Sequence, residues 1–304
     1  MSAGAHSPFR EGQTFAGRTA FVRYANLVKL PHTLFALPFA LVGVVLASYV
    51  KDVTLGAILW VALAFGSARF AAMAFNRIVD RRLDALNPRT ASREIPAGLV
   101  TVRGATAAVM VASTLFVVSA WRLNPLCLAL APLALAWVLG YSYTKRFTPW
   151  AHLVLGLGLG IAPVGGYLAV TGTWSDPWWM LPVLAAAVMT WVAGFDVLYA
   201  LQDIAFDRDT GLHSIPAALG EHRALTVARI LHAGAVAALA AVGWAVGAGP
   251  LYWAGVAVVA GLLLFEHSLV RADDLSRLDA AFFTMNGIIS VTFFGFVLAE
   301  RLIR

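Results

Sequence analysis

Two sets of acidic residues stand where long apolar runs end, and their types and spacing suit metal binding. The first set is Asn76, Asp80 and Asp84, and the second set is Asp196, Asp203 and Asp207. Side chains at i, i+4 and i+8, or at i, i+7 and i+11, project from one face of a helix. Each set therefore predicts an acidic column on a helix. Two facing columns would suit a diphosphate bridged by Mg²⁺, which binds a few carboxylates together with water and substrate phosphates.

Basic residues near these columns could bind the charge of a leaving diphosphate, which needs positive partners already in place. The candidates are Lys29, Arg69, Lys145 and Arg146. Arg69 precedes Asn76 by seven residues, so it lies on the same face of the helix and about 10 Å deeper in the membrane. We expect it to face a cavity and bind an acceptor carboxylate. The alternatives are snorkelling for Arg69 and interface anchoring for Lys145 and Arg146.

Other polar residues in apolar runs carry weaker predictions. Asp196 lies about two turns deeper than Asp203, where a carboxylate is costly without a partner. Asn286 in the last apolar run is expected to line the cavity, or else to make an interhelical hydrogen bond. The histidines at positions 32, 152, 232 and 267 show no metal-ligand spacing, so they are interpreted as packing or interface residues.

The elements that must position these residues are membrane helices. The chain has 304 residues, a mean hydropathy of +0.78 and 12% charged residues, whereas soluble domains carry about 25% charged residues. Nine apolar stretches approach the length of a bilayer span: 33–50, 54–75, 104–121, 125–141, 151–171, 178–200, 224–247, 250–270 and 280–299. They lack the period-two alternation of a membrane barrel. We therefore expect an all-α integral membrane protein with nine transmembrane helices around a central cavity.

Loop charge predicts the orientation of this array. With a cytoplasmic N-terminus, 17 of the 22 Lys and Arg residues lie on the cytoplasmic side and four lie on the other side. Both acidic sets, and the opening of the cavity, then face the cytoplasm. The same asymmetry accounts for the net charge of +6, so no nucleic-acid partner is expected. The sequence predicts a multi-pass protein of the bacterial inner membrane, in contact with membrane lipid.

Residues 23–304 are interpreted as a single domain, and residues 1–22 as a mobile segment. The first 30 residues contain four Lys or Arg residues and no short apolar core with a cleavage site, so no removable signal peptide is expected. The one cysteine, Cys127, is interpreted as a small hydrophobic residue. The sequence does not specify an oligomeric state.

Two long motifs resemble those of a known family. The run NRIVDRRLDALNPRTASREIPAG follows the second apolar stretch, and DVLYALQDIAFDRDTGLHSIPAALG follows the sixth. They resemble the two Asp-rich signatures of the UbiA superfamily of intramembrane prenyltransferases. The second has the form usual in the 4-hydroxybenzoate polyprenyltransferase branch. The opening KLPHTLFALPFA and the YxxxK stretch that ends at Lys145 also match.

The resemblance implies roles for individual residues. Asn76, Asp80 and Asp84 would hold one Mg²⁺ on a prenyl diphosphate, and Asp203 and Asp207 would hold another. Asp196 would act near an aromatic acid acceptor or its proton, and Lys145 would bind the diphosphate, with Tyr141 and Tyr199 nearby. Ser214 stands at the serine position of the family's G-x-K-S motif, and His213 replaces its lysine. The two tyrosines could instead be aromatic residues of the membrane interface.

One departure from the family pattern affects the metal site. The usual first signature begins Asn-Asp, whereas this chain has Asn76 and Arg77. The change removes one potential ligand and is expected to add a cation at the rim. This form resembles a branch in which the acceptor is 1,4-dihydroxy-6-naphthoate, on a route to menaquinone. The alternative acceptor is 4-hydroxybenzoate, on the route to ubiquinone.

The sequence thus predicts transfer of a polyprenyl group from its diphosphate to a hydroxylated aromatic carboxylate. Water must be excluded from the allylic cation, and a cavity between membrane helices would exclude it. We expect the isoprenoid tail to follow phenylalanines of the last span, or these residues to face lipid instead: Phe282, Phe283, Phe293, Phe294 and Phe296. Two other classes remain open, a cation-coupled transporter that uses the acidic sets and a lipid-binding protein without catalysis.

Overall fold

The computed structural model describes residues 15–17, 19–270, 275, 278 and 284–304, with the backbone alone for residues 31–35. This part of the chain is helical and contains no strand. Its α-helices are α1 (Ala20–Leu27), α2 (Leu30–Ala47), α3 (Leu55–Leu86), α4 (Val102–Leu123), α5 (Pro125–Gly140), α6 (Ala151–Thr171), α7 (Met180–Tyr199), α8 (Ile204–Asp209), α9 (Ile215–Leu219), α10 (Glu221–Ala245), α11 (Pro250–Leu269) and α12 (Asn286–Ile303). Two 3₁₀ helices, η1 (Tyr141–Arg146) and η2 (Ala200–Asp203), extend α5 and α7.

Eight helices of the described residues are long and apolar enough to cross a membrane. The chain is therefore a multi-pass, all-α membrane protein. Helix α2 has 18 residues, but its described apolar part, Ala36–Ala47, is shorter than a full span. The expected count of nine spans and the cytoplasmic opening stay predictions.

Local chemistry explains where several long helices begin. The side chains of Thr54 and Thr101 accept hydrogen bonds from the amides of Ala57 and Gly104 and cap α3 and α4. Asn124 caps α5 in the same way, with Pro125 in the first helical position. Each of these helices therefore starts where the sequence supplies a capping residue.

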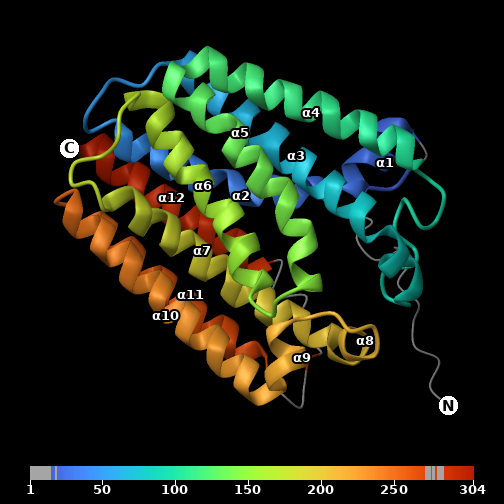
Figure 1. Cartoon of the computed structure of the whole chain (residues 1–304). Coiled ribbons are helices and arrows are strands. Elements are labelled where there is room, and N and C mark those ends of the chain that lie inside the picture. Colours follow the sequence, from blue (N-terminus) through green and yellow to red (C-terminus); the bar gives the residue numbers. More distant parts are fainter. Residues whose placement is uncertain (1–14, 18, 271–274, 276–277, 279–283) are drawn as a thin grey trace.

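The long helices pack side by side, and α2, α6 and α7 lie at the centre of their contacts. Helix α3 packs on α4, and α6 packs on both α2 and α7; α10 packs on α7, and α11 packs on α12. The largest core cluster lies between α2, α6, α7, α10, α11 and α12. In Figure 1 the short helices α1, α8 and α9 gather at one end of the bundle, and the C-terminus lies at the other end.

The second expected span continues without a break into the acidic segment. Helix α3 has 32 residues, or about 48 Å at 1.5 Å per residue, against a hydrocarbon core of about 30 Å. Its last turns, which carry the first acidic set, therefore extend beyond the apolar layer.

The expected tail path along the last span is wrong at Phe293. This side chain is fully buried and stacks on Phe39 with ring centroids 6.0 Å apart. Phe294 packs against the same core cluster, and Phe296 lies close to Gly255 on α11. Phe282 and Phe283 lie outside the described residues.

The N-terminal boundary expected at residue 22 falls inside a helix, because α1 begins at Ala20. The backbone amide of Phe15 donates to Oδ1 of Asn26 at 2.9 Å, which ties that residue to α1. Residues 1–14 and 18 of the segment expected to be mobile lie outside the described residues.

Candidate active site

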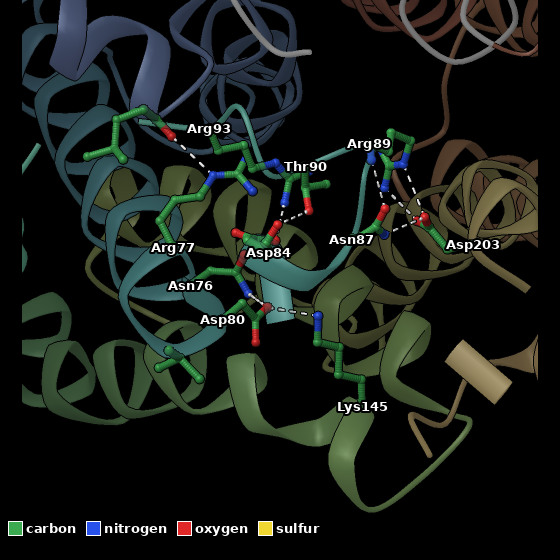
Figure 2. Close-up of polar contacts among 12 residues, drawn as sticks. Asn76, Arg77, Asp80, Asp84, Asn87, Arg89, Thr90, Arg93, Lys145 and Asp203 are labelled. Carbon is green, nitrogen blue, oxygen red and sulfur yellow. Dashed lines mark hydrogen bonds and ion pairs between the residues drawn. The ribbon is translucent and has the colours of Figure 1, made fainter. Parts of the chain in front are cut away.

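The first acidic set is paired with cations that follow α5. Asp80 is buried, and its carboxylate accepts from Nζ of Lys145 at 2.8 Å and from Nη2 of Arg146 at 2.8 Å. Asn76 donates to Oδ2 of the same carboxylate at 3.1 Å, as Figure 2 shows. Helix η1 thus brings both basic residues predicted from the sequence onto the central acid of the first set.

Asp84, one turn further along α3, is also buried. Its Oδ1 accepts from Nη1 of Arg93 at 2.7 Å, and its backbone carbonyl accepts from the hydroxyl of Thr90 at 3.0 Å. Within the described part of the chain, its Oδ2 has no hydrogen-bond partner. A buried carboxylate oxygen without a partner is costly in a protein interior, so this atom is available to a ligand.

The loop after α3 crosses to the second acidic set. Nε of Arg89 donates to Oδ1 of Asp203 at 3.1 Å, and its Nη2 pairs with Oδ2 of the same carboxylate. Asn87 also donates to Oδ1, at 3.1 Å. Nη1 of Arg89 donates to the Tyr199 hydroxyl at 3.1 Å, and Nζ of Lys29 lies 6.0 Å from the centroid of the Tyr199 ring. The bidentate pair holds Asp203 in a fixed orientation.

The prediction of one continuous helix through the second set is wrong. Helix α7 ends at Tyr199, the 3₁₀ helix η2 covers the next four residues, and α8 begins at Ile204. A 3₁₀ helix has 3.0 residues per turn instead of 3.6. The angular spacing assumed for Asp196, Asp203 and Asp207 therefore does not hold across η2.

Residues 213–215 connect the second set to the first. The amide of His213 donates to the carbonyl of Lys145 at 2.8 Å. The Ser214 hydroxyl donates to Oδ2 of Asp207 at 2.7 Å and also caps α9. Asp207 lies within electrostatic range of Asp203 and Lys145. Lys145 thus stands between the two acidic sets, and its backbone is held by the segment that holds Asp207.

A histidine interpreted as a packing residue is the partner of the deeper acid. Nδ1 of His152 on α6 lies 2.7 Å from Oδ2 of Asp196 on α7. The two residues are 44 positions apart, so no local spacing could have linked them. His152 is buried, as a packing residue would be, and it also has this polar partner. His232 and His267 also contact each other, at 3.0 Å, and the side chain of His32 lies outside the described residues.

Arg69 faces a cavity, as expected. It lines an apolar cavity of about 200 Å³ between α3, α4, α5 and α6, together with Tyr141. Among the described residues, its buried Nε has no hydrogen-bond partner. Tyr141 lies within electrostatic range of Arg69, Asp80 and Asp196. Tyr141 therefore connects the cavity wall to the charged groups of the first acidic set and Asp196.

Two residues that were predicted to lie at the site, Arg77 and Asn286, lie elsewhere in the bundle. Arg77 is buried, and its Nε donates to the carbonyl of Leu27 at 3.4 Å, so it is not a cation at the rim. Asn286 is buried and donates to Oε1 of Glu266 at 3.3 Å. It does not line the cavity beside Arg69, and it makes the interhelical bond that was the alternative. Both side chains bond to acceptors inside the bundle.

The oxygen ligands of the site fit a divalent cation whose remaining ligands come from the substrate. In the described ranges, no three His, Cys, Asp or Glu side chains converge, so these residues do not form an all-protein metal cage. Mg²⁺ does not require one, because it binds one or two carboxylates plus water and phosphate oxygens. The unpartnered Oδ2 of Asp84 and the carboxylate of Asp80 suit that role. Four cations in the same region suit an anion: Arg89, Arg93, Lys145 and Arg146.

Fold and site together define a helical membrane protein with a clustered acidic and basic site above an apolar cavity. The model of the UbiA prenyltransferase family matches residues 36–288. The chain belongs to this family, and it is a prenyltransferase.

Relatives and solved structures agree with this assignment. The 4-hydroxybenzoate octaprenyltransferase of Aromatoleum aromaticum is 31% identical over 76% of this chain and 77% of its own. That of Citrobacter koseri is 30% identical over 79% and 83%. The apo structure of a UbiA homolog from Aeropyrum pernix K1 superposes with a TM-score of 0.81 at 37% identity, covering 88% of this chain and 98% of its own. A UbiA homolog from Archaeoglobus fulgidus bound to GPP and Mg²⁺ shares the fold, with a TM-score of 0.68 at 20% identity over 92% and 99% of the two chains.

Proposed function

We propose that this enzyme transfers a polyprenyl group from a prenyl diphosphate to a hydroxylated aromatic carboxylate, using Mg²⁺. The observation that carries the proposal is the arrangement around Tyr141. Its hydroxyl lies within electrostatic range of Asp80, Arg69 and Asp196. In the proposed reaction these residues serve the diphosphate, the acceptor carboxylate and the ring proton, respectively. The names of the relatives support 4-hydroxybenzoate as the acceptor. The Asn76-Arg77 form of the first signature supports 1,4-dihydroxy-6-naphthoate.

The diphosphate is placed at Lys145, Arg146 and Arg89. The side chain of Lys145 is 36% exposed while that of Asp80 is 4% exposed, so Lys145 can reach a ligand without uncovering the acid. Asn76, Asp80 and Asp84 would hold one Mg²⁺ and Asp203 and Asp207 another, and the bound ions would supply electrophilic assistance to the leaving group. The cations stabilise the negative charge that develops as the allylic C–O bond breaks.

The acceptor is placed between Arg69 and Asp196. Its carboxylate binds the guanidinium of Arg69, and a ring carbon forms the new C–C bond with the allylic carbon. Asp196 accepts the ring proton as the C–H electron pair returns to the ring. The apolar walls beside Arg69 exclude water from the allylic cation. Lys29 and Tyr199 lie next to the Arg89–Asp203 pair. Ser214 holds Asp207.

The setting that we propose is quinone biosynthesis at the bacterial inner membrane, with the site facing the cytoplasm. The loop-charge asymmetry supports this orientation. The lipid bilayer would deliver the long apolar tail of the donor.

Purified protein in detergent tests the proposal. With geranyl diphosphate, Mg²⁺ and either acid, it should yield diphosphate and a prenylated acid, which mass spectrometry would detect. Without Mg²⁺ it should yield no product. Asp80→Ala and Asp203→Ala should reduce turnover by at least about 100-fold, the scale of lost electrostatic stabilisation. Asp52→Ala, an exposed acid between α2 and α3, is the control. Cation binding without product formation would favour the transporter, and unchanged quinone content in cells carrying these variants would favour a lipid-binding protein.

A further inference from the structure

Asp196 is held by one protein side chain within the described part of the chain, that of His152. The His152 side chain is 7% exposed and the Asp196 side chain is 25% exposed, so the histidine lies behind the acid, away from solvent. His152 comes from α6 and Asp196 from α7, two helices that pack closely along their lengths. The proposed function does not use His152.

The backbone of α9 determines which nitrogen of His152 carries the proton. The amide of Ile215 donates to Nε2 of His152 at 3.4 Å. An amide N–H is only a donor, so Nε2 must be the acceptor and the ring proton must be on Nδ1. Nδ1–H then donates to Oδ2 of Asp196 at 2.7 Å. This is a neutral histidine that donates to a carboxylate, and it leaves the other carboxylate oxygen for substrate.

We propose that His152 is a positioning residue that holds Asp196 as an oriented carboxylate for removal of the acceptor's ring proton. This inference rests on the proposed function. Without the Nδ1–H bond, the carboxylate would rotate about its side-chain torsions, and the oriented base would be lost from the reaction.

The assigned step conserves atoms and charge. After the new C–C bond forms, the ring carbon carries both hydrogen and the prenyl group, and the ring is cationic. The C–H bond breaks, its electron pair restores the aromatic ring, and the proton forms an O–H bond with Asp196. His152 keeps its own proton throughout and stabilises the carboxylate before transfer.

Three substitutions of His152 test this role in the purified full-length enzyme with geranyl diphosphate and 4-hydroxybenzoate. The side-chain amide of Asn places an N–H near the position of Nδ1–H, so His152→Asn should retain turnover within about fivefold of native. His152→Gln, which places its amide one bond further out, and His152→Phe, which has no donor, should lower kcat by roughly 10- to 100-fold, less than loss of the base itself. The KM for geranyl diphosphate should change less than about twofold, because the diphosphate does not contact this pair. His222→Phe at an exposed position of α10 is the matched control.

Deuterium on the ring carbons next to the hydroxyl gives a readout that a structural role would not change. The kinetic isotope effect is the rate with unlabelled acceptor divided by the rate with deuterated acceptor. Because proton removal should be slower in His152→Phe, this effect should be larger in the variant than in the native enzyme. Equal loss in all three variants, or an unchanged isotope effect with lower kcat, would show that the histidine only packs and would overturn the proposal. Native-like turnover of His152→Phe would overturn it as well. Absence of product from native enzyme with either acid would instead refute the proposed function, and this role with it.

Discussion

Asp84 keeps one carboxylate oxygen without a protein partner in a buried position, while its other oxygen is paired with Arg93. An acid that served only to balance charge would be expected to use both oxygens. The free oxygen is therefore the feature of the first set that most directly suggests a metal ligand. Asp80, by contrast, accepts from three side chains in the described structure: Asn76, Lys145 and Arg146.

Replacing Asp84 by Asn should weaken Mg²⁺ binding more than it affects the fold. The amide keeps the volume and one oxygen but loses the charge, so the Mg²⁺ concentration for half-maximal turnover should rise roughly 10-fold or more, as with other weakened metal sites. A Mg²⁺ titration of the steady-state rate measures this, with Asp52→Asn as the control. An unchanged half-saturation with lower kcat would contradict the role as a ligand.

Arg69 is the residue that should distinguish binding of the acceptor from binding of the donor. Arg69→Ala should raise the KM for the aromatic acid about 10- to 100-fold, because a charge-assisted hydrogen bond contributes about 1.5–3 kcal/mol. The KM for the prenyl diphosphate should remain near native. Arg103→Ala, on an exposed position of α4, should leave both unchanged. Equal increases in both KM values would place Arg69 at the diphosphate instead.

At the scale of elements, the distance between α6 and α7 depends on small residues. A Cβ on Gly156 would overlap the carbonyl of Met189, and one on Gly160 would meet the carbonyl of Ala185. Small residues let helices in a membrane approach closely, where packing is a main source of stability. This close approach also brings His152 and Asp196, one on each helix, within hydrogen-bonding distance.

Gly156→Ala should therefore destabilise the protein, although alanine has the higher helix propensity. Overpacking of this kind typically costs 1–3 kcal/mol, and we expect a lower midpoint of thermal unfolding in detergent together with lower turnover. Gly165→Ala on the same helix is the matched control, because a Cβ there meets no atom within 4 Å. Its unfolding midpoint should equal or exceed that of the native protein. A similar fall in both variants would show that the contact with Met189 does not matter.

For the whole molecule, the orientation in the membrane is the property that most needs a direct test. In a Cys127→Ala background, a membrane-impermeant maleimide applied to spheroplasts should label Lys51→Cys, between α2 and α3, and should not label Thr210→Cys, after α8. Both positions are exposed, so both should react once the membrane is permeabilised. Labelling of Thr210→Cys alone in sealed spheroplasts would reverse the orientation predicted from loop charge.

Composition and periodicity by themselves determined the class of this protein, because burying apolar helices in a bilayer requires long uncharged runs that are visible in any such sequence. The two motifs were sufficient for the family, and the residue spacing in the first set was correct because α3 is one unbroken helix. The same reasoning failed for the second set because a 3₁₀ turn interrupts it. The position of such a turn is not visible in the spacing of the acidic residues.

The tertiary structure alone decided which residues meet. Arg89 reaches Asp203 across 114 positions, and His152 reaches Asp196 across 44. No periodicity relates such residues, since their contact depends on how α3, α6 and α7 pack. The structure also placed the apolar cavity beside α3 to α6 and Phe293 in the core. A phenylalanine on a membrane helix can pack inward or face lipid at similar cost, and only the neighbouring helices select between the two.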